Sequence, residues 1–209
     1  LGVDVLYRLL NDGRFEWPRA STAVTASLLV LSIPAHMPWE QVAVGLFVAV
    51  FFGKLVVDRS ALRVNPMLLG RLFMMLLYPD SIQQWLPPEA EIDALTSATA
   101  LGLYASEGAT IGVGDLLLGN LSGTWEDFVA ILPGSPGEVM PLLGIAFGVI
   151  LYATGVLDWR PGIAFLAGFA AACPFFGLPV VFHVFSGSVI FSAVYNLTDW
   201  RSMPGSKAG

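Results

Sequence analysis

Long apolar runs, bounded by prolines and charged residues, limit the folds open to this chain. Of its 209 residues, 56% are hydrophobic and only 12% are charged, about half the charged share of a soluble domain. We therefore expect an all-α polytopic membrane protein with about six membrane segments. The apolar runs cover residues 20–34, 41–53, 66–79, 137–157, 161–182 and 185–198. Several are shorter than the roughly 17 to 25 residues of a spanning helix, so we expect short or broken helices.

Lysine and arginine are absent between Leu72 and Trp159, whereas ten acidic residues fall in that interval. When six segments are threaded with the N-terminus in the cytoplasm, every basic loop lies on the cytoplasmic face, as the positive-inside rule requires. The acidic loop, residues 80–136, then lies on the extracytoplasmic face. It separates an N-terminal membrane half, residues 1–79, from a C-terminal half and tail, residues 137–209. Each half crosses the membrane three times, so the halves form an inverted repeat.

The composition also argues against other classes of protein. The formal net charge is −6 and there is no basic run, so a nucleic-acid partner is not expected. Cys173 is the single cysteine, which excludes an internal disulfide and is too few for a metal cluster. No cleavable signal peptide is visible, and residues 1–10 read like the last turns of a helix whose start is missing.

The acidic loop contains apolar stretches of its own. We expect a short interfacial or re-entrant helix over Ser97–Ala105 and another over residues 115–121, with glycine and proline punctuating the rest. Non-helical backbone at membrane depth must be buried in protein or line a wet cavity. A cofactor site and a simple lid over the helices both fit such a loop, and composition alone favours the lid.

Several blocks of the sequence, taken in order, resemble one family. They are TASLLVLSIPAHMPW from Thr25, NPMLLGRLFMMLLYP from Asn65, DALTSATAL from Asp93, LLLGNLSGTW, PGSPGEVMPLLGIAFGVILY from Pro133 and HVFSGSVIFSAVYNLTD from His183. Together they resemble the membrane flavin subunits of the Rnf and Nqr redox complexes, namely the D subunit of Rnf and the B subunit of Nqr. The likeness covers most of the chain. Family members have further segments on both sides, so the resemblance implies a shortened member.

In that family a [Ser/Thr]-x-Ala-Thr motif carries FMN, joined through its phosphate to the last threonine by a flavin transferase that works outside the cytoplasm. Here the motif reads Thr96-Ser97-Ala98-Thr99. The resemblance therefore implies that Thr99 is the acceptor and that the rest of the motif belongs to the cofactor site. Asp93 would disfavour anionic flavin states or contact the transferase, and a solvated loop acid is the alternative. Independently of flavin, Thr96 could cap a helix that begins near Ser97, with Thr99 in its first turn.

Some residues near the motif, and one farther along the chain, have two interpretations each. Trp85, Tyr104 and Trp125 would stack on the flavin ring or anchor the chain at the membrane interface. His183 would hydrogen-bond a second cofactor or a quinone, or it would be a satisfied core histidine. The sequence leaves these alternatives open.

Two local patterns predict details of the fold. Asn65 before Pro66 predicts a helix cap with proline at the first helical position. Gly187, in the sequence SGS, predicts close backbone packing at that point of the chain.

The resemblance implies an electron-transfer subunit of a membrane redox complex rather than a self-contained enzyme. It implies covalently attached FMN, leaves room for a second flavin, and links the complex to Na⁺ or H⁺ translocation. The implied partners are other membrane and peripheral subunits, the lipid bilayer and a flavin transferase, in the inner membrane of a bacterium or archaeon. Two alternatives stay open: a non-redox scaffold subunit of another membrane complex, and a small-solute transporter or channel with the same fold.

Overall fold

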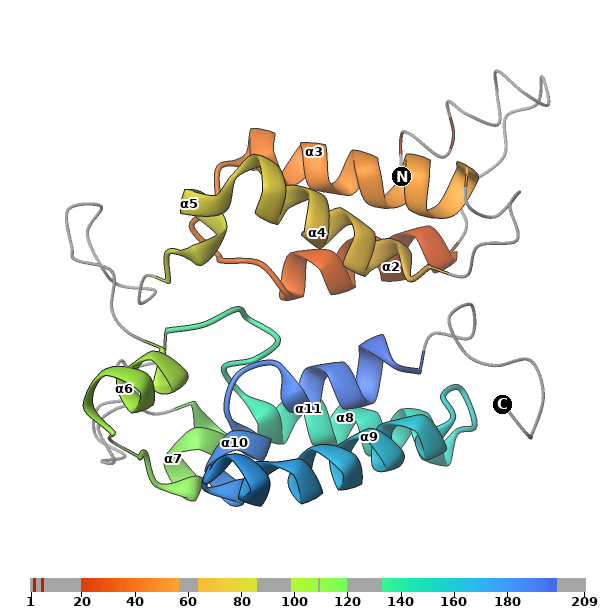
Figure 1. Cartoon of the computed structure of the whole chain (residues 1–209). Coiled ribbons are helices and arrows are strands. Elements are labelled where there is room, and N and C mark those ends of the chain that lie inside the picture. Colours follow the sequence, from red (N-terminus) through yellow and green to blue (C-terminus); the bar gives the residue numbers. More distant parts are fainter. Residues whose placement is uncertain are drawn as a thin grey trace. The chain divides into compact units, whose positions relative to one another are not determined.

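The computed structural model describes residues 20–56, 64–85, 99–108, 110–119 and 133–198, with isolated positions at Gly2 and Val5. Across these ranges the regular structure is helical and contains no strand (Figure 1). The expected all-α class is therefore confirmed for the part of the chain that the structure describes. The chain divides into two compact units, one holding the described residues up to Gln83 and the other those from Gln84 onward.

The first unit is a small bundle of apolar helices. It contains α2 (Ala20–Leu31), α3 (Trp39–Val50), α4 (Pro66–Leu77) and the short α5 (Pro79–Gln83). α2, α3 and α4 all pack on one another, and α3 continues into a π-helical segment, Phe51–Val56. Glycine allows α3 and α4 to approach closely, because a Cβ atom on Gly70 would lie 2.8 Å from the Gly45 carbonyl oxygen. Small residues of this kind are typical of helix interfaces in membranes.

The start of α4 confirms the predicted cap at Asn65. The Asn65 side chain accepts hydrogen bonds from the amides of Met67 at 3.0 Å and Leu68 at 3.4 Å. Pro66 takes the first helical position, where the missing N–H costs nothing because that amide has no partner within the helix. Both features follow from neighbouring residues alone.

The second unit contains the two loop helices together with the C-terminal helices. Its elements are α6 (Ala100–Glu107), α7 (Val113–Leu118), α8 (Pro141–Ala153), α9 (Trp159–Ala172), a 3₁₀ turn (Cys173–Phe176), α10 (Val180–Phe185), α11 (Val189–Phe191) and a π-helical turn (Ser192–Asn196). In Figure 1, α6 and α7 lie beside α10 at one end of this unit. The helices of the acidic loop therefore share a folded unit with the C-terminal half.

Glycines on α8 and α9 bring these helices close to the π-helical turn. A Cβ atom on Gly162 would lie 2.5 Å from the Ala193 carbonyl oxygen, and one on Gly148 would lie 2.6 Å from Val194 Cγ1. The Tyr195 hydroxyl also donates a hydrogen bond to the Gly144 carbonyl at 3.1 Å. This long-range bond connects the π-helical turn to the first turn of α8.

Helix boundaries beyond residue 137 differ from those predicted. The segment expected over 137–157 begins as a turn, and α8 starts only at Pro141. The run expected over 161–182 is interrupted, because Pro174 has no N–H for an α-helical bond and Gly177 turns the chain with φ +68°. A further break, Ser186–Ser188, separates α10 from α11. The C-terminal helices are consequently shorter than the apolar runs indicated.

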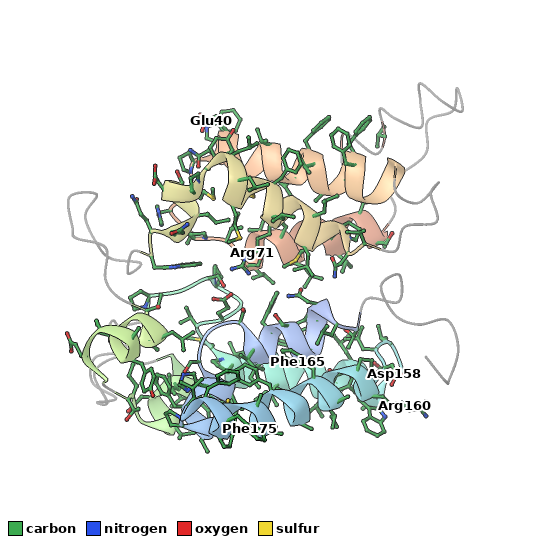
Figure 2. All side chains as sticks on the ribbon, in the orientation of Figure 1. Glu40, Arg71, Asp158, Arg160, Phe165 and Phe175 are labelled. Carbon is green, nitrogen blue, oxygen red and sulfur yellow. The ribbon has the colours of Figure 1, made fainter. Side chains whose placement is uncertain are left out.

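One helix within the described ranges is long and apolar enough to cross a membrane, Trp159–Phe176, which joins α9 to its 3₁₀ turn. Asp158 and Arg160 lie at one end of this span and Phe175 at the other (Figure 2). The Phe175 side chain is 87% exposed, so that end presents an aromatic surface. The other apolar helices are shorter, at Ala20–Leu31, Trp39–Gly53, Pro66–Leu77 and Pro141–Ala153. Six membrane segments therefore stay a prediction.

Candidate functional site

Thr99 is the N-cap of α6. Its backbone is extended (φ −61°, ψ 164°), and its Oγ1 accepts a hydrogen bond from the Gly102 amide at 3.1 Å. Its carbonyl oxygen accepts the first α-helical bond, from the Leu103 amide at 2.9 Å. The Thr99 side chain is half-buried. The predicted acceptor hydroxyl therefore lies at a defined structural position, the end of a helix.

This geometry corrects the predicted start of the helix. A helix beginning near Ser97 would place Thr99 in the first turn, with helical backbone angles. The extended ψ of Thr99 rules out that arrangement, and α6 begins at Ala100. The residue that caps α6 is Thr99 rather than the predicted Thr96.

The N-terminal end of α6 suits a negatively charged substituent. The first amides of a helix have no intrahelical carbonyl partner, and the aligned peptide dipoles add a partial positive charge at that end. The first turn of α6 contains no acidic side chain that would compete for this field. A phosphate group attached to Thr99 Oγ1 would therefore lie in a favourable electrostatic environment.

The other predicted members of the site lie outside the described residues. They are Asp93, Thr96, Ser97 and Ala98, and the aromatic candidate Trp125 falls in the same category. Among Asp93 and the four motif residues, Thr99 is the one whose surroundings the structure describes.

The helix that Thr99 caps rests on a small apolar core shared by three helices. Ala100 of α6, Leu116 of α7 and Phe182 of α10 form its buried centre. Around them pack the half-buried side chains Tyr104, Ile111, Val139 and Phe185. Ala100 is the residue next to Thr99, so the candidate attachment point is joined directly to this core.

Tyr104 and His183 meet in the same region. The Tyr104 ring lies 5.3 Å from the Phe182 ring and 4.9 Å from the His183 ring, the latter at 90°. The Tyr104 ring is half-buried and packs on both of these rings. His183 is buried and its Nδ1 lies 3.0 Å from the Pro179 carbonyl. Because a carbonyl only accepts, Nδ1 carries the proton, as expected for a satisfied core histidine.

The break after α10 lies against the first turn of α6. Gly187 has φ +58°, and a Cβ atom there would lie 2.9 Å from Leu101 Cδ1. The Ser186 hydroxyl donates a hydrogen bond to the Phe182 carbonyl. The chain is closely packed at Gly187, but the neighbour is the Leu101 side chain rather than the predicted backbone.

Comparison of the sequence with known protein families identifies the family of this chain. The sequence model of the NQR2, RnfD, RnfE family matches residues 1–209. The chain belongs to this family. The resemblance inferred from the ordered blocks is thereby confirmed.

Two curated relatives show what kind of protein this chain is similar to. One from Chromohalobacter salexigens is 29% identical over 205 residues, and one from Pseudomonas aeruginosa is 30% identical over 206 residues. Each is named as the B subunit of Na⁺-translocating NADH-quinone reductase, and each alignment covers 91% of this chain. The chain spans about half the length of these relatives, 46% and 47% respectively.

Sequence reasoning missed the residues that pack against α6 next to Thr99. Leu116, Phe182 and Phe185 had no predicted role, although Phe182 and Phe185 stand three apart in VVFHVF. That spacing puts them on one face of α10 and could have signalled a packed surface. Nothing local to Leu116 indicates that it would meet Ala100, because that contact depends on the chain path between α6 and α10.

Proposed function

We propose that this chain is an electron-transfer subunit of an Rnf- or Nqr-type membrane redox complex and carries FMN as a phosphoester on Thr99. The position of Thr99 is the observation that carries this proposal. The residue closes the Thr96–Thr99 motif and stands half-buried at the N-cap of α6. Membership of the NQR2, RnfD, RnfE family supports the same assignment.

The residues around Thr99 fit a phosphate ester. The Gly102 amide donates to the oxygen that would bridge carbon and phosphorus, and the end of α6 favours the negative charge of the phosphate. Ala100 fixes the attachment point to a packed core. On the resemblance, Asp93, Thr96, Ser97 and Ala98 complete the site. Bound FMN would supply the electron chemistry, while the protein sets its position and surroundings.

The proposal includes a membrane location and partners. The charge distribution favours an extracytoplasmic position for the loop that bears Thr99, which is the side on which the family's flavin transferase works. The relatives are named as subunits of a Na⁺-translocating NADH-quinone reductase. We extend to this chain a place in a multi-subunit inner-membrane complex that couples electron transfer to movement of Na⁺ or H⁺.

Fluorescence in a denaturing gel tests the flavin directly. The protein is made in cells with an active flavin transferase, and covalent FMN gives a fluorescent band that survives denaturation. We expect Thr99→Ser to keep the band, because serine retains a hydroxyl. Thr99→Ala and Thr99→Asn should both be dark, and asparagine matters most because it preserves the helix cap.

Thr110→Ala is the matched control, since Thr110 is an exposed threonine in the same loop, and it should stay fluorescent. Mass spectrometry of the peptide then locates the added FMN. Modification at Thr96 or Ser97 would move the site, and a dark wild-type band would sink the redox proposal.

A transporter of small solutes is the second candidate, favoured by the break between α10 and α11. Discontinuous helices often form substrate sites in transporters, because their ends present unpaired backbone groups. This candidate needs no flavin. A dark wild-type protein that mediates solute uptake in vesicles would support it over the redox proposal.

A further inference from the structure

We propose that Tyr104 and Gly187 are positioning residues for flavin attachment: they hold α6 on α10 and so present the Thr99 hydroxyl to the transferase. This inference rests on the proposed function. It goes beyond the motif, because neither residue belongs to the sequence Thr96–Thr99.

The first step of the argument is the length of α6. The helix has only eight residues, Ala100–Glu107, and an isolated helix of this length is not stable in water. Its position must therefore come from contacts with neighbouring elements. The structure provides two such contacts on α10 and on the turn that follows it.

The first contact is aromatic. Tyr104 lies one turn beyond Thr99, and its ring meets Phe182 at 5.3 Å and His183 at 4.9 Å. Phe182 and His183 also contact each other, with ring centroids 5.2 Å apart at 78°. His183 is held in turn by its hydrogen bond to the Pro179 carbonyl. The centre of α6 therefore packs on a surface that is itself fixed.

The second contact lies nearer to Thr99. Leu101 Cδ1 occupies the space that a side chain on residue 187 would need, at 2.9 Å from a Cβ atom there. Gly187 also has φ +58°, a conformation that costs other residues free energy. The Ser186 hydroxyl bonds to the Phe182 carbonyl immediately before this turn. A glycine at 187 thus allows the first turn of α6 to approach the break between α10 and α11.

Together the two contacts fix α6 at both of its turns. Displacing a reactive group by about 1 Å can lower a rate by about 100-fold. Loss of either contact should therefore reduce transfer of FMN to Thr99 while the bundle of α8 and α9 stays folded.

Tyr104 is tested by the flavin-to-protein ratio of the full chain, purified from cells with an active transferase. Tyr104→Leu should lower the ratio about tenfold, and Tyr104→Phe should keep it because the ring contacts remain. Phe165→Leu is the control for losing a ring elsewhere in the same unit, since Phe165 stacks on Phe169 in α9 at 6.1 Å. It should leave the ratio unchanged.

Gly187 gives an independent test. Gly187→Ala should lower the ratio, whereas Gly155→Ala should not, because Gly155 has a similar φ of +72° with no atom within 4 Å of its added methyl group. This pair separates backbone strain from the collision with Leu101.

The outcomes separate this inference from the proposed function. A dark wild type removes the proposed function and the inference with it. A bright wild type with equally bright Tyr104→Leu and Gly187→Ala overturns the inference alone. If Tyr104→Leu does not fold, the Gly187 series decides. Equal losses in the Gly187→Ala and Gly155→Ala variants, or in Tyr104→Leu and Phe165→Leu, would show a merely structural role and also overturn it.

Discussion

A single oxygen, Thr99 Oγ1, is both the cap of α6 and the proposed acceptor of FMN. As a cap it accepts from the Gly102 amide. Replacing Thr99 with alanine should weaken the first turn by about 1 kcal/mol, whereas asparagine should preserve it. Hydrogen exchange followed by mass spectrometry should therefore speed up at the Gly102 amide in Thr99→Ala only. Equal exchange in the wild type and both variants would contradict the capping role.

At the scale of elements, the close approach of α9 to the π-helical turn can be tested by comparing two glycine-to-alanine variants of α9. Gly162→Ala should destabilise the protein by about 1–3 kcal/mol, because the new methyl carbon would lie 2.5 Å from the Ala193 carbonyl oxygen. Gly168→Ala, on the same helix with no atom within 4 Å, should stabilise it by up to about 1 kcal/mol. Thermal unfolding in detergent should move in opposite directions for the two variants. Shifts of the same sign would contradict the close approach.

The elements also show what the sequence can and cannot predict. The cap at Asn65 was predictable because the asparagine and Pro66 stand side by side, and both act locally. The cap at Thr99 was not, because Thr96 and Thr99 satisfy the same local pattern three residues apart. In the structure Thr99 is the cap, and the next residue, Ala100, packs against Leu116 and Phe182, contacts that no local pattern contains.

The breaks in the C-terminal helices likewise divide into one with a local signal in the sequence and one that depends on long-range contacts. Pro174 and Gly177 signal the end of α9 in the sequence. They lie inside an apolar run, however, and the run's hydropathy predicts one continuous segment. The break at Ser186–Ser188 contains no proline. Its conformation is fixed by the Ser186 bond to Phe182 and by the contact of Gly187 with Leu101, and the latter joins residues 86 positions apart in the chain.

At the scale of the whole molecule, the charge distribution predicts opposite sides of the membrane for Glu107 and Arg160. Both side chains are exposed, so cysteines at these positions should be reactive. In intact cells, a membrane-impermeant maleimide should label Glu107→Cys and leave Arg160→Cys unlabelled until the membrane is permeabilised. The native Cys173 is buried, so the unaltered chain should give little background.

The opposite labelling pattern would reverse the topology, and labelling of both positions in intact cells would contradict the threading of three crossings on each side of the acidic loop. Either result would leave the helical packing within each unit unchanged. Only the opposite pattern would, however, place the Thr99 hydroxyl on the side of the membrane where the proposed attachment of FMN does not take place.

The cap at Thr99 also has an evolutionary consequence. Because α6 needs a capping side chain whether or not FMN is attached, selection for folding alone would keep a polar residue at position 99. A lineage that no longer attached flavin could drift from threonine to asparagine or aspartate without loss of the fold, since both are good caps. Serine would preserve both roles. Among related sequences, the chemical type of residue 99 would therefore distinguish a retained modification from a retained helix.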